Sequence, residues 1–262
     1  MPSRWTHERK VAAAEAAPRD RVLVHPDTRI VERPGWFQVI TPSARGYLNE
    51  IGLSALESDE VDAAIDAAIA TYHPSGTAVK WVVGPWTRPA DMAERLAARG
   101  FAPHELSAMG ASTAASFEAP ARVEVRRVAD EDELDVFVEV SVRGYGMGAD
   151  TAAAHRGALA AALAAEAPRV ALWVARLEGV AVGNAALILG RDHGYLIGGL
   201  VLPEARGQGI YRALVAARMA ALAALGVEYA VTHAVATTSA PILARLGFEA
   251  LYPSTVWSLP PP

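Results

Sequence analysis

The stretch Val201–Leu214, which reads VLPEARGQGIYRAL, constrains the fold of this chain more than any other part of its sequence. An apolar run that is typical of a strand precedes it, and a long apolar-striped segment follows it. The sequence therefore predicts a strand, a tight glycine turn and a helix in immediate succession. Gly207 and Gly209 permit backbone conformations and close approaches that a Cβ would hinder.

This predicted turn has the features of an anion site. The first N–H groups of a helix have no partner inside the helix, and the helix dipole adds partial positive charge there. Several amides of a glycine turn can point at one anion, and Arg206 adds a full charge at the mouth. The turn is therefore suited to bind a pyrophosphate.

The hexapeptide RGQGIY at residues 206–211 resembles the signature of the GNAT superfamily of acyl-CoA-dependent N-acetyltransferases. In that family the loop follows a Val-x-Pro strand end, which is Val201-Leu202-Pro203 here. Tyr211 departs from the pattern because a small residue is usual at its position. A large side chain there affects how closely the helix approaches a cofactor.

The resemblance implies direct transfer of an acetyl group from acetyl-CoA to an amine in a ternary complex. The implied pyrophosphate site is the loop amides with two flanking arginines, and the implied donor to the thioester oxygen is a backbone N–H late in the preceding strand, at Val201. The expected cofactor-binding residues are Leu200, Val201, Leu202, Arg206, Gly207, Gln208, Gly209, Ile210, Tyr211 and Arg212. Gly198-Gly199 indicates either a functional bulge that frees backbone groups or a simple bend.

The proton donor for the leaving thiolate is less defined. Many family members have a Tyr five residues before the Phe of a Gly-Phe pair, but Leu243 stands there and cannot donate a proton. Candidate substitutes are Ser239, Tyr211 and Tyr145. Each has a structural alternative, since Ser239 fits a helix N-cap, Tyr211 a packing residue and Tyr145 a pocket wall.

His233 is the candidate base for the acceptor amine. It is the one imidazole on a central predicted strand of the C-terminal half, and the ordinary pKa of histidine suits proton abstraction near neutral pH. It shares a strand face with Tyr229, Val231 and Val235, so a buried core histidine is the alternative. Deprotonation through water, without one essential base, fits the sequence equally well.

Two segments of the chain resemble each other and indicate an internal repeat. Residues 95–110 (RLAARGFAPHELSAMG) and 244–259 (ARLGFEALYPSTVWSL) both read as a helix end, a glycine cap, a phenylalanine and a closing strand. We expect an α/β (α+β) fold of two GNAT-like modules, each a mixed, mostly antiparallel sheet flanked by helices. The modules are expected at 1–112 and 121–262, joined by the small-residue segment Gly110–Pro120. The first should be degenerate, because the acidic ALESDE replaces the glycine loop.

Local patterns in three places predict turns and caps. Ser58 fits the N-cap of an amphipathic helix, and Glu178-Gly179 fits the turn of a hairpin. The segment Gly144–Gly148 predicts a loop between two helices, with Asp150 capping the second.

Composition narrows the functional class. The absence of cysteine excludes disulfides, thiolate metal sites and a cysteinyl-enzyme route, and we expect no metal site. The net charge of −5 and the scattered arginines disfavour a nucleic-acid partner. The charged start of the chain and the lack of a long apolar window predict a cytoplasmic protein without membrane spans.

The expected acceptor is a small-molecule amine or a peptide N-terminus, and the expected assembly is a monomer or a homodimer. Two alternatives remain at this stage. One is a catalytically inactive acyl-CoA binder or sensor, because Leu243 and Tyr211 depart from the family pattern. The other is a Rossmann-like dinucleotide binder, which is disfavoured because RGQGIY lacks the first glycine of G-x-G-x-x-G and lies late in the chain.

Overall fold

The computed structural model describes residues 4–20, 24–44, 48–115, 117 and 120–262. The chain forms two compact units that exchange segments. Unit 1 consists of Met1–Leu23, Met109–His233 and Pro241–Leu251, and unit 2 consists of Val24–Ala108, Ala234–Ala240 and Tyr252–Pro262. Within the described ranges, no helix is long and apolar enough to cross a bilayer.

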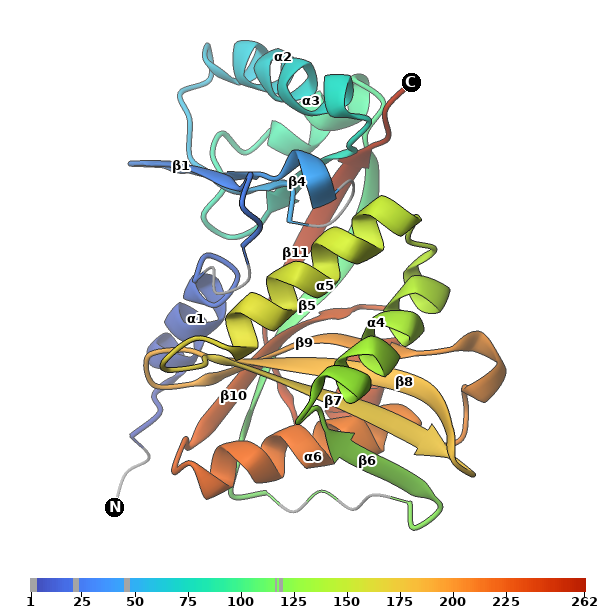
Figure 1. The fold of residues 1–262 in the computed structure, drawn as a ribbon. Coiled ribbons are helices and arrows are strands. Elements are labelled where there is room, and N and C mark those ends of the chain that lie inside the picture. The colour runs from blue at the N-terminus through green and yellow to red at the C-terminus, as the bar shows by residue number, and fades with distance from the viewer. Residues whose placement is uncertain (1–3, 21–23, 45–47, 116, 118–119) are drawn as a thin grey trace. The chain divides into compact units, whose positions relative to one another are not determined.

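Unit 1 holds a mixed sheet between helices (Figure 1). Its elements are α1 (His7–Ala16), β6 (Val123–Arg127), α4 (Glu131–Tyr145), α5 (Ala149–Leu163), β7 (Val170–Leu177), β8 (Val180–Leu189), β9 (Gly194–Val201), α6 (Ile210–Ala224) and β10 (Tyr229–Val235), whose last two residues lie in unit 2. Strands β6, β7, β8 and β9 are antiparallel neighbours, and β10 runs parallel to β9. Figure 1 shows α4 and α5 on one face of β7 and β8 and α6 on the other.

The core of unit 1 explains why the predicted elements form. The first six of the eight residues of β7 are buried, as expected for a strand covered on both faces. Helix α4 begins at Asp130, whose side chain accepts a hydrogen bond from the Glu133 amide at 2.9 Å, and acidic residues in its first turn complement the helix dipole. The predicted turn between β7 and β8 is confirmed, because Glu178 and Gly179 both have positive φ, 50° and 82°.

Unit 2 holds the remaining strands of the same 11-stranded sheet, covered by two helices (Figure 1). Its elements are β1 (Arg29–Arg33), β2 (Trp36–Ile40), β3 (Glu50–Ser54), α2 (Val61–Tyr72), β4 (Val79–Val83) and α3 (Met92–Ala98), with most of β5 (Ala102–Ser112), the first two residues of α7 (Ser239–Arg245) and the end of β11 (Glu249–Leu259). Strands β1 to β3 are antiparallel, and β4 pairs with β3 in parallel. Trp36 and Trp81 meet edge to face in its core.

The two units repeat one strand-helix-strand pattern. In unit 2, α2 connects the parallel pair β3 and β4; in unit 1, α6 connects the parallel pair β9 and β10. A strand that joins a parallel neighbour needs such a crossover, so the repeat follows from the topology of each sheet. The predicted α/β architecture with mostly antiparallel sheets is confirmed.

The compact units do not follow the order of the chain, unlike the modules expected at 1–112 and 121–262. The last strand of the chain completes the sheet of unit 2, where Thr255 to Leu259 pair antiparallel with Val83 to Val79. Helix α1 belongs to unit 1. The compact bodies share strands, and the division at 112 and 121 stays a prediction about a repeat in the sequence.

The expected linker Gly110–Pro120 is shorter than predicted, because β5 continues through Ser112. Gly110 is needed inside the strand because a Cβ there would lie 2.4 Å from the hydroxyl of Tyr229. Thr113 then bonds the carbonyl oxygens of Val227 and Glu228. Residues 116 and 118–119 of the expected linker lie outside the described residues.

Three local predictions were wrong. Ser58 does not cap α2, because its hydroxyl accepts a hydrogen bond from Arg95 at 2.8 Å. Helix α4 runs through Gly144 to Tyr145 instead of ending before a loop; Gly144 is required because a Cβ there would lie 2.2 Å from the side chain of Leu200. Asp150 lies in the first turn of α5, and Gly148 is the N-cap.

Helix α1 is held on unit 1 by aromatic and ionic contacts. Trp5 stacks on Tyr229 with ring centroids 4.7 Å apart. Arg9 pairs with Asp192, and the Lys10 ammonium lies 2.6 Å from Glu249. The hydrogen bond from Arg9 lowers the pKa of Asp192 below its ordinary value.

We expect acid to weaken this attachment of α1. A carboxyl whose pKa is lowered by folding stabilises the fold above its unfolded pKa, and that contribution is lost as pH falls through its folded pKa. The pair is partly exposed, so its contribution is about 0.5 kcal/mol or less. The unfolding temperature should therefore fall less between about pH 6 and pH 3 in Asp192→Asn than in the unmodified protein. An equal acid loss in both proteins would contradict the role of Asp192.

Candidate functional site

The end of β9 and the start of α6 build the glycine turn that the sequence predicts. A short 3-10 turn, Pro203–Ala205, leads into Gly207 and Gly209, whose φ values are 76° and 80°. Gly209 is the N-cap of α6, and Ala213 makes the first helical hydrogen bond back to its carbonyl. No side chain of the described chain caps this N-terminus, so its first amides face outward for a ligand.

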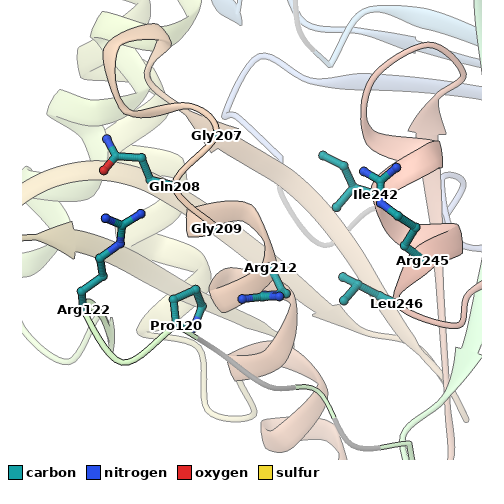
Figure 2. A pocket seen from close by; sticks show the side chains of 9 residues that line it. All are labelled: Pro120, Arg122, Gly207, Gln208, Gly209, Arg212, Ile242, Arg245 and Leu246. Atoms are coloured by element: carbon teal, nitrogen blue, oxygen red, sulfur yellow. The ribbon is translucent and has the colours of Figure 1, made fainter.

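A pocket of about 500 Å³ lies beside this turn (Figure 2). Figure 2 shows Arg122, Pro120 and Gln208 on one side of it and Ile242, Arg245 and Leu246, from α7 and the residue after it, on the other, with Arg212 between them. The residues that line it are Pro120, Arg122, Gly207, Gln208, Gly209, Arg212, Ile242, Arg245 and Leu246. All of them belong to unit 1.

The pocket is strongly basic. Arg122, Arg212 and Arg245 are exposed, and none of them forms an ion pair with any residue that the structure describes. Three unpaired guanidinium groups beside a helix N-terminus attract anions, and guanidinium forks suit phosphate oxygens. Ile242 and Leu246 add an apolar wall. The arrangement suits a ligand that carries several phosphates and a flat or apolar group.

The structure brings four of the predicted cofactor residues together in this pocket: Gly207, Gln208, Gly209 and Arg212. Arg206 does not line it, because its guanidinium Nε lies 3.4 Å from the carbonyl oxygen of Val201. The side chain of Ile210 is buried, so only its amide can face a ligand.

Five lining residues escaped the sequence analysis: Pro120, Arg122, Ile242, Arg245 and Leu246. They come from the segment before β6 and from α7 and the residue after it, which are far from the turn in sequence. No spacing in the sequence predicts their approach. The clearest signal in the sequence was the small-residue segment that ends at Pro120. In the structure this segment packs against the turn, since a Cβ on Gly209 would lie 2.6 Å from the Pro120 ring.

At the end of β9, the backbone amide of Val201 points away from the neighbouring strand β8. The Leu202 amide donates to the Val182 carbonyl at 2.9 Å, so it is already used on the β8 side. Successive amides of a strand point to opposite edges, which directs the Val201 N–H away from β8. Arg206 approaches the Val201 carbonyl, which faces the same edge as the Val201 N–H.

Strands β9 and β10 are paired only where they begin. Their register covers Gly194 with Ala230 and Tyr195 with Val231, and the Thr232 hydroxyl then donates to the Leu196 carbonyl at 2.8 Å. In the described register, no further pair joins the end of β9 to β10. The outward edge of β9 near Val201 is therefore available to a ligand.

A bulge interrupts β9 at Gly198-Gly199. The register passes from the pair Ala186 and Ile197 directly to Asn184 and Leu200, so two glycines oppose Ala185. Gly198 has a φ of 59°, and a Cβ on Gly199 would lie 2.8 Å from the Tyr211 ring. Tyr211, which departs from the family pattern, therefore packs over the bulge.

The proton-donor candidates have different environments. Tyr145 is exposed at the end of α4; the surrounding protein raises its pKa, and the charge of Arg218 offsets part of this effect. It is therefore protonated at neutral pH, as an acid must be. The Ser239 hydroxyl accepts a hydrogen bond from the Val235 amide at 2.9 Å and stabilises the turn before α7. Leu243 is fully buried.

His233 lies on β10 with its Nδ1 3.4 Å from the hydroxyl of Tyr195. The two rings meet edge to face, with centroids 5.9 Å apart. The imidazole is only partly buried, so it is not enclosed as a core histidine would be. Its partner Tyr195 can fix the orientation of the ring.

Residues 135–248 match the model of the acetyltransferase (GNAT) family. The whole chain resembles a GCN5-related N-acetyltransferase from Kribbella flavida with a TM-score of 0.64 and 16% identity, over 97% of this chain and 96% of that one. It also resembles a functionally unknown conserved protein from Staphylococcus epidermidis ATCC 12228, with a TM-score of 0.66 and 13% identity over 92% and 96% of the two chains.

A third similar structure is a tandem GNAT protein from the clavulanic acid biosynthesis pathway, with a TM-score of 0.57 and 13% identity over 96% of this chain and 87% of that one. No curated protein sequence matches the chain. At these identities the structural likeness establishes the fold alone. The chain therefore shares its fold with a tandem GNAT protein, and its residues 135–248 match the acetyltransferase (GNAT) family.

Proposed function

We propose that this protein is an N-acetyltransferase that moves the acetyl group of acetyl-CoA directly to a primary amine of a small molecule or a peptide. The observation that carries this proposal is the basic pocket beside the α6 N-terminus. Its outward amides and its unpaired arginines match the phosphates of CoA, and its apolar wall offers a surface for the adenine ring.

The reaction can be followed through the residues of unit 1. With the phosphates at the glycine turn, the pantetheine arm would run along the unpaired edge of β9 toward the bulge. The Val201 N–H would donate to the thioester oxygen as the amine attacks the carbonyl carbon. The carbon–sulfur bond then breaks, and the thiolate takes a proton from an acid for which Tyr145 and Tyr211 are our candidates in unit 1.

A catalytically inactive acyl-CoA binder or sensor is the second candidate function. The buried Leu243 favours it, because that position lacks a proton donor. An amine screen with detection of free thiol separates the two functions. The chain has no cysteine, so every thiol that appears must come from CoA. Release of CoA that depends on a particular amine supports the enzyme, and binding of acetyl-CoA without release with any amine supports the sensor.

We expect His233→Gln to lower kcat by about 100-fold, because a positioned base contributes about 10²–10⁴ to a rate. Affinity for acetyl-CoA should stay unchanged, since the pocket beside α6 does not include His233. Steady-state kinetics and calorimetry measure the two quantities. Tyr195→Phe is the matched variant: it removes the hydroxyl beside His233 and should lower kcat less.

An unchanged kcat in His233→Gln would eliminate the histidine as base and favour deprotonation through water. A fall in thermal stability with no separate loss of kcat would assign it a structural role.

A further inference from the structure

Arg218 carries a charge in the centre of unit 1 that the proposed reaction does not use. It lies on α6 and is only 2% exposed. The guanidinium meets no carboxylate among the described residues, and burial lowers its pKa to about 10, so it stays charged at neutral pH. An apolar residue of similar length would fill this space without the cost of burying a charge.

The guanidinium donates to three backbone carbonyls. Its Nε bonds Leu214 on the preceding turn of α6 at 3.0 Å. Its Nη1 bonds Ala186 on β8 at 3.1 Å and Ile197 on β9 at 3.2 Å. One planar group therefore joins a helix to two neighbouring strands.

The two strand carbonyls belong to the pair at the edge of the bulge. Ala186 and Ile197 are the last regular pair before Gly198-Gly199. The Nη2 of Arg218 faces the bulge itself, because a Cβ on Gly199 would lie 3.5 Å from it. Arg218 thus contacts both the end of the regular ladder and the extra residue that interrupts it.

We propose that Arg218 is a positioning residue that fixes the β9 bulge and thereby the direction of the backbone amides that follow it. The guanidinium holds the carbonyls of Ala186 and Ile197 through Nη1 and that of Leu214 through Nε, an arrangement of two fixed nitrogens that a single ammonium cannot reproduce. Because the bulge sets the path of β9 from Gly198 onward, the same contact aligns the Val201 amide. This inference rests on the proposed function only where it concerns that amide.

Arg218→Met removes the donors and keeps an apolar chain. Amide exchange in a peptide covering 194–202 should become at least about tenfold faster, because the bulge loses its anchor. The kcat should fall by about 100-fold, as expected when a donor is displaced by about an ångström, while the KM for acetyl-CoA changes little. Arg218→Lys should give intermediate values for both quantities.

Leu134→Ala is the control, because it creates a cavity in the core of unit 1 and leaves the three hydrogen bonds of Arg218 in place. It should lower thermal stability and leave exchange in 194–202 unchanged. Wild-type exchange there in Arg218→Met, or equal acceleration in Leu134→Ala, would overturn the proposal. If Arg218→Met fails to fold, Arg218→Lys decides by the same criterion.

The exchange measurement separates this inference from the proposed function. A protein that acetylates no amine would refute the proposed function, whereas the exchange in 194–202 would still show whether Arg218 holds the bulge.

Discussion

Replacing Arg212 and Arg245 together by Gln is expected to weaken acetyl-CoA binding about 100-fold, which is about tenfold for each exposed charge. Both guanidinium groups line the pocket beside the glycine turn and are free of ion pairs in the described chain. Each loses a charge-assisted contact to a phosphate when it becomes Gln. Calorimetric titration measures the change, and the fold should be unaffected because both side chains are exposed.

Two controls accompany this test: the dependence of binding on salt and a variant of an arginine outside the pocket. Added salt screens exposed charges, so it should weaken acetyl-CoA binding by the unmodified protein more than by the double variant. Arg156→Gln is the control, since Arg156 is an arginine of α5 that pairs with Glu131 and Asp135 outside the pocket. Equal affinities in the double variant and the control would show that the phosphates bind elsewhere.

Gly209→Ala is the second variant with a large expected effect, again about a 100-fold loss of affinity for acetyl-CoA, since displaced amides would forfeit charge-assisted bonds. Gly209 has a φ of 80°, and a Cβ there would lie 2.6 Å from the Pro120 ring. The loop must shift to remove this contact. The amides at the start of α6 would then no longer converge on one anion.

Gly179→Ala separates backbone strain from the loss of the site. Gly179 has nearly the same φ, 82°, but a Cβ there meets open space in the turn between β7 and β8. In both variants, the strain of an alanine at a left-handed φ should lower the free energy of unfolding by about 1–2 kcal/mol. Only Gly209→Ala should lose affinity in calorimetry. Wild-type affinity in Gly209→Ala would place the pyrophosphate away from this turn.

The sequence was sufficient where local chemistry decides the structure. The two-residue hairpin turn Glu178-Gly179 has positive φ at both positions, and a glycine at the second position adopts such a φ without help from distant residues. The glycine turn before α6 is of the same kind, because its role depends on Gly207 and Gly209 and on the helix that follows. Such features are encoded within a few residues.

The sequence was misleading where a residue far away in the chain determines the local structure. Gly144 and Gly110 read as breaks, yet each lies inside a regular element because a distant side chain, Leu200 or Tyr229, occupies the space of its Cβ. Ser58 was expected to cap α2, but its hydroxyl accepts a hydrogen bond from Arg95. Close packing between elements far apart in sequence leaves no local pattern.

The candidate site shows the same division. The turn supplies Gly207 to Gly209 and Arg212, which the sequence predicts, whereas Arg122 and Arg245 reach the pocket through the fold. Arg218 could not be singled out from the sequence either, since its partners are backbone carbonyls on two strands. Carbonyl groups carry no sequence signal.

Titration of the purified protein with acetyl-CoA, with NAD as a control ligand, shows whether the glycine turn before α6 binds CoA. We expect one acetyl-CoA site per chain, because the basic glycine turn occurs in unit 1 while the acidic segment ALESDE stands at the corresponding position of unit 2. Binding should weaken with added salt, and NAD should bind much more weakly. Absence of acetyl-CoA binding would contradict the proposed function, and a second site would contradict the assignment of unit 2 as degenerate.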